Sequence, residues 1–116
     1  MRDDRPAASP LSTQVFHILL ALLDEDLHGY AIIQAIDAET EGEVRLTAST
    51  LYAAIKRLLD SGWIEETRQR PRADDDPRRR YYHLTAVGRQ AARAEAQRLD
   101  RLAGLARAKR LIPARP

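Results

Sequence analysis

The segment from residue 47 to residue 62 constrains the fold more than any other part of the chain. Thr47 is a good N-cap, and Ser61 and Gly62 stop the helix that follows it. The apolar side chains recur at the i, i+4, i+7, i+8 spacing of an amphipathic helix: Leu51, Ile55, Leu58 and Leu59. At about 100° per residue, the opposite face is small, hydroxylated and cationic, and it carries Ser49, Ala53, Lys56 and Asp60, flanked by Tyr52 and Arg57. Such a face is suited to lying in a groove of a larger partner.

Two further helices are predicted before this one. The first begins near Ser12, or one turn earlier with Ser9 as its cap and Pro10 in the first turn. Its apolar residues recur at helical spacing: Val15, Phe16, Leu19, Leu20, Leu22 and Leu23. The second runs from His28 to about Thr40 and is closed by Gly42. Its inward residues are Ile32, Ile33 and Ile36.

A β-hairpin and a long helix are predicted after residue 62. Residues 63–69 and 79–84 are short segments with β-forming side chains. Residues 70–78 separate them, and two prolines keep this highly charged stretch out of regular structure. From Thr85 to about Leu111 the chain is rich in Ala, Arg and Leu, which predicts one helix capped by Thr85.

The order of elements predicts a mainly α fold with a small β-hairpin, a winged helix-turn-helix followed by a long C-terminal helix, for which the seam and the resemblance described below predict dimerisation. Residues 1–10 are expected to form a flexible arm, residues 11–84 the DNA-binding domain and residues 85–112 the dimerisation helix. A length of 116 residues suits one domain with one modest core. The helix that follows Thr47 would be the reading helix, which contacts base edges in the major groove. The cationic hairpin offers a second contact point on a duplex, in the minor groove.

Charge is divided unevenly along the chain. Residues 1–44 hold nine acidic and two basic side chains, whereas residues 45–116 hold eight acidic and seventeen basic ones. Seventeen of the nineteen cationic residues are arginine. This asymmetry indicates a surface for an anionic partner, nucleic acid in the first place, although a solvated face would look the same.

Several other classes of function are disfavoured. The chain has no cysteine, which excludes disulfides, thiolate metal sites and a thiol nucleophile. The histidines at positions 17, 28 and 83 lack metal-ligand spacing, and neither a phosphate-binding glycine loop nor a nucleophile elbow occurs. We therefore expect neither an enzyme nor a bound metal or cofactor. The longest apolar run, residues 15–23, is too short to span a bilayer, so a cytoplasmic protein without membrane contact, located at the nucleoid when bound to DNA, is expected.

Four ordered segments carry a resemblance to a known family. They are LHGY at residues 27–30, STLYAAIKRL at 49–58, SGWI at 61–64 and RYYHLTAVG at 80–88. Together they resemble the PadR family of bacterial transcriptional regulators, over about residues 11–92. The family pattern has glycine at the position of Ser49 and proline at that of Ala53, so the match departs inside the reading helix.

The resemblance implies a homodimeric repressor on palindromic double-stranded DNA, in which the last helix of each subunit packs on its partner. About 30 residues follow the hairpin, as in the short members with a single C-terminal helix. Some short members bind planar aromatic drugs at the dimer interface through a tryptophan on that helix. The single tryptophan here, Trp63, precedes the first hairpin strand and is expected in the core, so a small-molecule effector stays unknown.

Ten residues are predicted to bind DNA: Tyr30, Thr47, Ser49, Thr50, Tyr52, Lys56, Arg57, Arg78, Arg79 and Arg80. Tyr52 could equally pack against the wing, and Tyr30 could be a half-buried structural tyrosine. Arginine in a narrow minor groove gains from its negative potential, although the aspartates at 74–76 could neutralise the arginine run.

A small-residue seam is predicted to make the dimer. It repeats at 4-3-4-3 spacing at Ala92, Ala96, Leu99, Ala103 and Ala106, and Leu102 and Leu105 lie beside it. The alternative function is a winged helix used for protein interaction or for RNA binding, which needs neither operator recognition nor matched reading helices.

Overall fold

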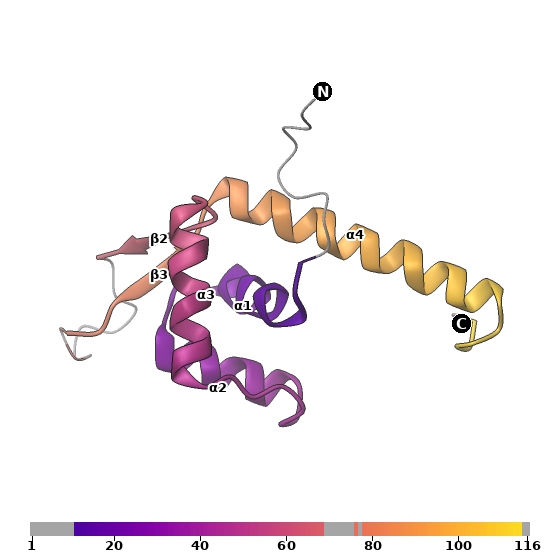
Figure 1. The fold of residues 1–116 in the computed structure, drawn as a ribbon, viewed down its shortest axis with the longest axis horizontal. Helices are drawn as coiled ribbons and strands as arrows, with labels where there is room; N and C mark the ends of the chain where they lie inside the picture. The colour runs from indigo at the N-terminus through magenta and orange to yellow at the C-terminus, as the bar shows by residue number, and fades with distance from the viewer. Residues whose placement is uncertain (1–10, 69–75, 77, 115–116) are drawn as a thin grey trace.

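A computed structural model describes residues 11–68, 76 and 78–114. Along the chain its elements are α1 (Thr13–Asp24), β1 (Leu27–His28), α2 (Gly29–Glu39), α3 (Ala48–Asp60), β2 (Ile64–Thr67), β3 (Tyr81–Leu84) and α4 (Ala86–Ala108) (Figure 1). This is the mainly helical winged-helix architecture that the sequence predicts. The predicted arm at residues 1–10 and most of the charged loop at 70–78 lie outside the described residues.

Hydroxyl side chains begin three of the helices. The Oγ atoms of Ser12, Thr47 and Thr85 accept hydrogen bonds from backbone N–H groups three residues further on, at 3.1, 3.2 and 3.1 Å. Each bond satisfies an amide that has no partner within its helix. Ser12 caps α1, so the alternative start one turn earlier is wrong.

The core lies between α1, α2, α3 and β3. Its largest fully buried side chains are Ile18, Leu19, Ile32, Ile36, Leu51 and Ile64. Trp63, which was expected in the core, is half-buried and packs against this cluster from outside it. The periodicities of the three helices therefore identify the faces that pack together.

The sheet has three strands where the sequence predicted two. β1 pairs antiparallel with β3, which places the strands in the order β1-β3-β2. The hairpin strands are also shorter than predicted, at Ile64–Thr67 and Tyr81–Leu84. A strand of two residues is too short to show alternation, so its existence depends on the partner strand and not on its own sequence.

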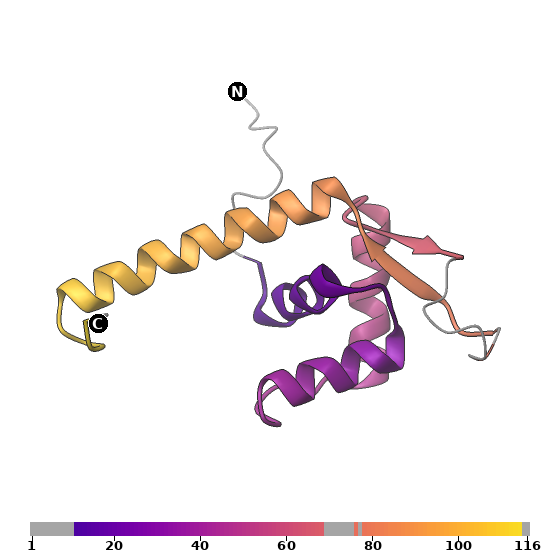
Figure 2. The same cartoon turned by 180° about the vertical axis from the view of Figure 1, so that it is seen from behind.

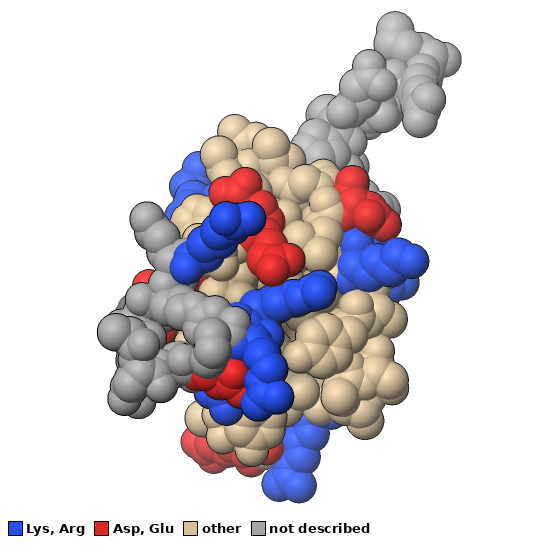
Figure 3. Space-filling view, turned by 90° about the vertical axis from the view of Figure 1, so that its left-hand side faces the viewer, with Lys and Arg blue, Asp and Glu red and all other residues tan. Residues whose placement is uncertain are grey.

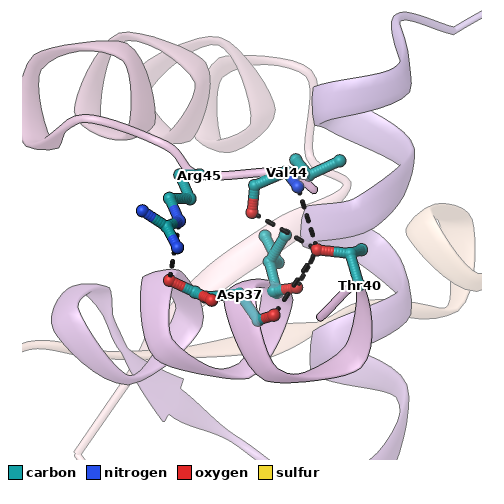
Figure 4. A network of polar contacts seen from close by, with 5 residues as sticks. Asp37, Thr40, Val44 and Arg45 are labelled. Carbon is teal, nitrogen blue, oxygen red and sulfur yellow. Dashed lines mark hydrogen bonds and ion pairs between the residues drawn. The ribbon is translucent and has the colours of Figure 1, made fainter. Parts of the chain in front are cut away.

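A fixed turn joins α2 to α3 (Figure 4). The Thr40 hydroxyl donates to the carbonyl of Ile36 at 2.8 Å and accepts from the amide of Val44 at 3.0 Å. Glu41 and Gly42 both have positive φ, at 54° and 81°. Asp37 forms an ion pair with Arg45 across the turn at 3.5 Å. These contacts set the direction in which α3 leaves the turn.

The last helix ends earlier than predicted, at Ala108 instead of about Leu111. Arg110 has a φ of 63°, and the amide of Leu111 donates to the carbonyl of Ala106 at 2.9 Å. The amide of Arg110 donates to the carbonyl of Arg107, also at 2.9 Å. These two bonds form a Schellman motif, which ends a helix with a left-handed residue. Both ribbon views show the second half of α4 extending beyond the other elements (Figures 1 and 2).

Candidate nucleic-acid interface

Five of the ten predicted DNA-binding residues line one hollow at the base of the wing. They are Tyr30, Tyr52, Arg78, Arg79 and Arg80. The other lining residues are His28, Gly29, Asp76 and Tyr82. We call this space of about 520 Å³ the wing hollow. Figure 3 shows Lys and Arg side chains gathered on this side of the molecule, with acidic side chains between them.

The two exposed tyrosines come from different helices. Tyr30 in α2 and Tyr52 in α3 are 59% and 51% exposed, so both phenols reach solvent. The ring of Tyr52 also lies against the first residue of α2, because a Cβ at Gly29 would stand 2.8 Å from its Cζ atom. The ring of Tyr52 thus packs on the start of α2, and its exposed part borders the wing hollow.

Tyr82 adds a buried phenol to the wing hollow. It is 4% exposed, and burial raises its pKa above the ordinary value of 10, with Tyr52 and Glu66 adding to the increase. Arg80 acts in the opposite direction. The phenol therefore stays neutral at physiological pH, so it places no negative charge where an anion would bind.

Acidic side chains contact Arg78 and Arg80 of the wing. The guanidinium of Arg78 donates to both carboxylate oxygens of Asp76 at 3.2 Å. Arg80 lies 3.9 Å from Glu66. Neutralisation by the acidic loop is thus observed for Asp76, whereas residues 74 and 75 lie outside the described residues. Both pairs are exposed to solvent, where an ion pair contributes little and a competing anion can replace it.

The remaining predicted residues lie along α3. Ser49, Lys56 and Arg57 are exposed, and the hydroxyl of Thr47, besides capping the helix, donates to the Thr50 hydroxyl at 3.0 Å. Arg57 does not share the hollow with Tyr52, since five residues along a helix turn its side chain by about 140°. It borders an apolar groove of about 410 Å³ with Leu11, Val15, Trp63 and others. Its placement on the flank of α3 matches the sequence prediction.

Three residues of the hollow were missed as site residues: His28, Gly29 and Tyr82. The segments that carry the family resemblance contain all three of them. His28 and Gly29 belong to the LHGY segment, and Tyr82 belongs to the RYYHLTAVG segment. Nothing in their local pattern indicates that the two segments meet. The β1–β3 pairing brings them together, with His28 opposite Tyr81 and Leu27 opposite Tyr82.

The predicted seam on α4 divides into two parts. Ala92 is 4% exposed and lies in the chain's own core, so its assignment to an exposed seam is wrong. The physical reason is that the first half of α4 packs against α1, and burial within a chain has the same helical period as burial between chains. Farther along, Leu99, Leu102 and Leu105 are 39%, 49% and 59% exposed. Ala96 is exposed as well, and Ala103 and Ala106 are partly exposed.

An ion pair between a buried glutamate and a partly exposed arginine marks the boundary between these two parts. Glu95 is 5% exposed and accepts from Arg98 Nη2 at 2.6 Å and from Arg98 Nε at 2.9 Å. The Arg98 hydrogen bonds lower the pKa of Glu95 below its ordinary value of 4.5 against the effect of burial, and the amide of Leu11 assists them. This carboxylate therefore ties the start of the described chain to α4.

The described part of the chain offers neither a metal site nor a membrane span. No group of three His, Cys, Asp or Glu side chains there could hold a metal ion. None of the described helices is both long and apolar enough to cross a membrane.

Comparison with known proteins is consistent with the geometry of this face. Residues 18–94 match the Transcriptional regulator PadR-like family. The uncharacterized protein X of Lysinibacillus sphaericus is 33% identical over 72 residues, which cover 62% of this chain and 64% of that protein. The match thus spans less than two thirds of that relative.

Two solved structures share the fold. A transcriptional regulator from Clostridium thermocellum superposes with a TM-score of 0.69 at 23% identity, covering 84% of this chain and 96% of that one. Bacillus subtilis PadR in complex with operator DNA superposes with a TM-score of 0.58 at 22% identity, covering 92% of this chain and 50% of that one.

Proposed function

Because the chain belongs to the PadR-like family of transcriptional regulators, we propose that it is a repressor that binds a palindromic operator in double-stranded DNA as a homodimer. The family consists of regulators and not of enzymes. The observation that carries the proposal is the wing hollow, which gathers Tyr30, Tyr52 and the arginines at 78–80 beside the exposed face of α3. Such a protein acts in the cytoplasm, at the nucleoid.

The helix and the wing have different tasks in this proposal. α3 lies in the major groove, where Ser49, Tyr52 and Lys56 face the base edges. The wing arginines and Tyr30 contact phosphates and the adjacent minor groove, because arginine gains from the negative potential there. Thr47, Thr50 and Arg57, at the start and on the flank of α3, lie where the phosphate backbone passes. The solved PadR complex with operator DNA supports the duplex as the partner.

The second half of α4 makes the dimer in this proposal. The interface consists of Ala96, Leu99, Leu102, Ala103, Leu105 and Ala106, without Ala92. Pairing two copies removes three exposed leucines of each subunit from water and lets the helices approach closely at the alanines. The paired helices then hold the two α3 helices at a fixed separation of about one helical turn of DNA, roughly 34–36 Å.

Enrichment of genomic DNA tests this function directly. The purified protein is incubated with fragments of its own genome, and the retained fragments are sequenced. Binding to a shared palindrome, followed by lower expression of the adjacent genes when the protein is present, is the expected result. A gel shift with matched duplex and single strands separates the alternatives. Preference for RNA or single strands, or no nucleic-acid binding at all, would favour the RNA-binding or protein-interaction module instead.

A further inference from the structure

Tyr82 brings the hydroxyl group of a buried side chain to the wing hollow. The residue is 4% exposed, its ring belongs to the core cluster, and it lines the hollow. Within the described part of the chain, no group forms a hydrogen bond with its phenol oxygen. A hydroxyl held by packing and left without a protein partner needs water or a ligand to satisfy it. The position therefore suits a ligand with an acceptor oxygen.

The start of α2 lies at the same hollow. In the β1–β3 register Leu27 stands opposite Tyr82, two residues before the helix begins. Nδ1 of His28 accepts from the amide of Ala31 at 3.1 Å and so caps one amide of the first turn. The amide of Tyr30, also in the first turn, has no acceptor within its helix. The partial positive charge at a helix N-terminus favours an anion at this place.

Tyr52 links the buried phenol to the helix start. Its ring lies against Gly29, the first residue of α2. Burial raises the pKa of the Tyr82 phenol and the Tyr52 phenol raises it further, which places the two hydroxyl groups near each other. The nearest acidic group on the wing is Glu66, opposite Tyr82 in β2, and its charge is offset by Arg80 at 3.9 Å.

We propose that the Tyr82 hydroxyl and the backbone amide of Tyr30 donate to one phosphate of the DNA backbone. This inference rests on the proposed function and adds a binding residue that the sequence did not indicate. A phosphodiester fits because its unbridged oxygens accept several hydrogen bonds and carry the charge that a helix start favours. The phenol is already fixed by its packing, so it loses little conformational freedom when it binds.

Tyr82→Phe tests the hydroxyl alone. Phenylalanine keeps the ring in the core and removes no hydrogen bond within the described chain, so the melting temperature should stay close to that of the wild type. Affinity for a random-sequence duplex, measured by fluorescence anisotropy, should fall about tenfold. Operator affinity should fall by the same factor, because a phosphate contact carries no sequence information. The slope of log K against log salt should stay unchanged, since a neutral group releases no counterion.

Tyr81→Phe is the matched control. Tyr81 is the neighbouring tyrosine of β3 and is 5% exposed, but it does not line the hollow. Successive side chains of a strand point to opposite faces, which explains the difference. Phenylalanine also keeps the edge-to-face ring contact with His28. Duplex affinity of this variant should therefore stay within about twofold of the wild type.

A neutral phosphate analogue locates the contact on the DNA. Single methylphosphonate replacements along the enriched operator duplex remove one charge and one acceptor oxygen at a time. At one position of each half-site, the replacement should weaken the wild type by a larger factor than it weakens Tyr82→Phe, because the hydroxyl and the oxygen belong to one contact. In 1H–15N spectra the Tyr30 amide should shift when duplex is added, and not with inorganic phosphate at the same phosphate concentration.

Several results would overturn the inference while leaving the proposed function intact. They are a Tyr82→Phe protein with wild-type duplex affinity, an equal loss in Tyr81→Phe, methylphosphonates that all cost the two proteins equally, or a Tyr30 amide that duplex does not shift. A Tyr30 shift with inorganic phosphate equal to that with duplex would overturn the assignment to DNA. A wild-type chain that fails to bind any duplex would overturn the proposed function, and this inference with it.

Discussion

The phenol of Tyr52 in α3 lies over the Cα atom of Gly29, the first residue of α2. The approach is close enough that a Cβ at position 29 would stand 2.8 Å from Tyr52 Cζ and even nearer to the hydroxyl. The close contact therefore depends on the absence of a side chain at position 29 and not on the backbone angles of glycine. The contact fixes where the exposed part of Tyr52 enters the wing hollow.

Gly29→Ala should weaken DNA binding more than it affects folding. Tyr52 is half-exposed and can turn away from the new methyl group, so the free energy of unfolding should change by less than about 1 kcal/mol. Affinity for duplex should fall about fivefold, the net value of roughly one hydrogen bond. Anisotropy titration and thermal melting measure the two effects on the same samples.

The matched control for this change is Gly104→Ala in α4. A Cβ at position 104 would meet no atom within 4 Å. Alanine there should stabilise the helix by about 0.5–1 kcal/mol and leave DNA binding unchanged. Wild-type affinity in Gly29→Ala would show that the position of Tyr52 is unimportant for binding.

The position of these residues explains how much of the site could be predicted from the sequence. Helix caps such as Thr47 and Thr85 were predictable, because an N-cap acts on an amide only three residues away. The residue types of the site were predictable as well, since Tyr52 and Lys56 stand opposite an apolar stripe. The wing hollow was not, because it depends on a two-residue strand that has no pattern of its own. Ala92 was misassigned because its spacing fits a dimer seam and a core face equally well.

Triple replacement of Arg78, Arg79 and Arg80 by alanine should weaken binding to all duplexes and flatten its salt dependence. Wild-type affinity should fall by about 10³–10⁵-fold between roughly 50 and 200 mM salt if the dimer makes about 6–10 phosphate contacts. Loss of three contacts in each subunit should reduce the slope of log K against log salt by several units, at about 0.9 per contact. Arg93→Ala on the exposed face of α4 is the control, and it should keep the wild-type slope.

Replacement of Lys56 or Tyr52 by alanine should have a different signature. Base contacts distinguish one DNA sequence from another. The difference in binding free energy between operator and random duplex should therefore fall by about 1–3 kcal/mol per lost base contact. Competition titration with operator and scrambled duplex measures this ratio. A triple arginine variant that binds random duplex normally, or a Lys56 variant with an unchanged ratio, would contradict the division of tasks between wing and helix.

Acid should destabilise the fold through Glu95. Its pKa is lowered in the folded chain by Arg98, so the carboxylate contributes stability above the unfolded value of about 4.5. That contribution is lost as the pH falls through the lower folded pKa. Glu95→Gln should lower the melting temperature at neutral pH and remove part of the acid dependence below pH 4.5. Exposed Glu43→Gln serves as the control, and equal acid profiles for the two variants would refute the role of Glu95.

Charge introduced at Leu99 and Leu102 should separate the dimer and abolish operator binding. These leucines are 39% and 49% exposed on the half of α4 that extends beyond the core, so Leu99→Glu with Leu102→Glu leaves the described core intact. In a dimer the same four carboxylates would be buried close together without partners, which costs far more than the interface contributes. The double variant should therefore be a folded monomer that unfolds in one cooperative transition, as expected for a single subunit with an intact core. Without a fixed separation between two α3 helices, it should lose operator affinity by orders of magnitude and retain weak, salt-sensitive binding to random duplex.

Val87→Glu, at an exposed apolar position in the first turn of α4, tests whether any new charge on this helix has the same effect, and it should stay dimeric. Analytical ultracentrifugation at micromolar concentration measures the mass of each species. A double variant that is still dimeric, or a wild type that is monomeric, would refute the assignment of the dimer to this half of α4.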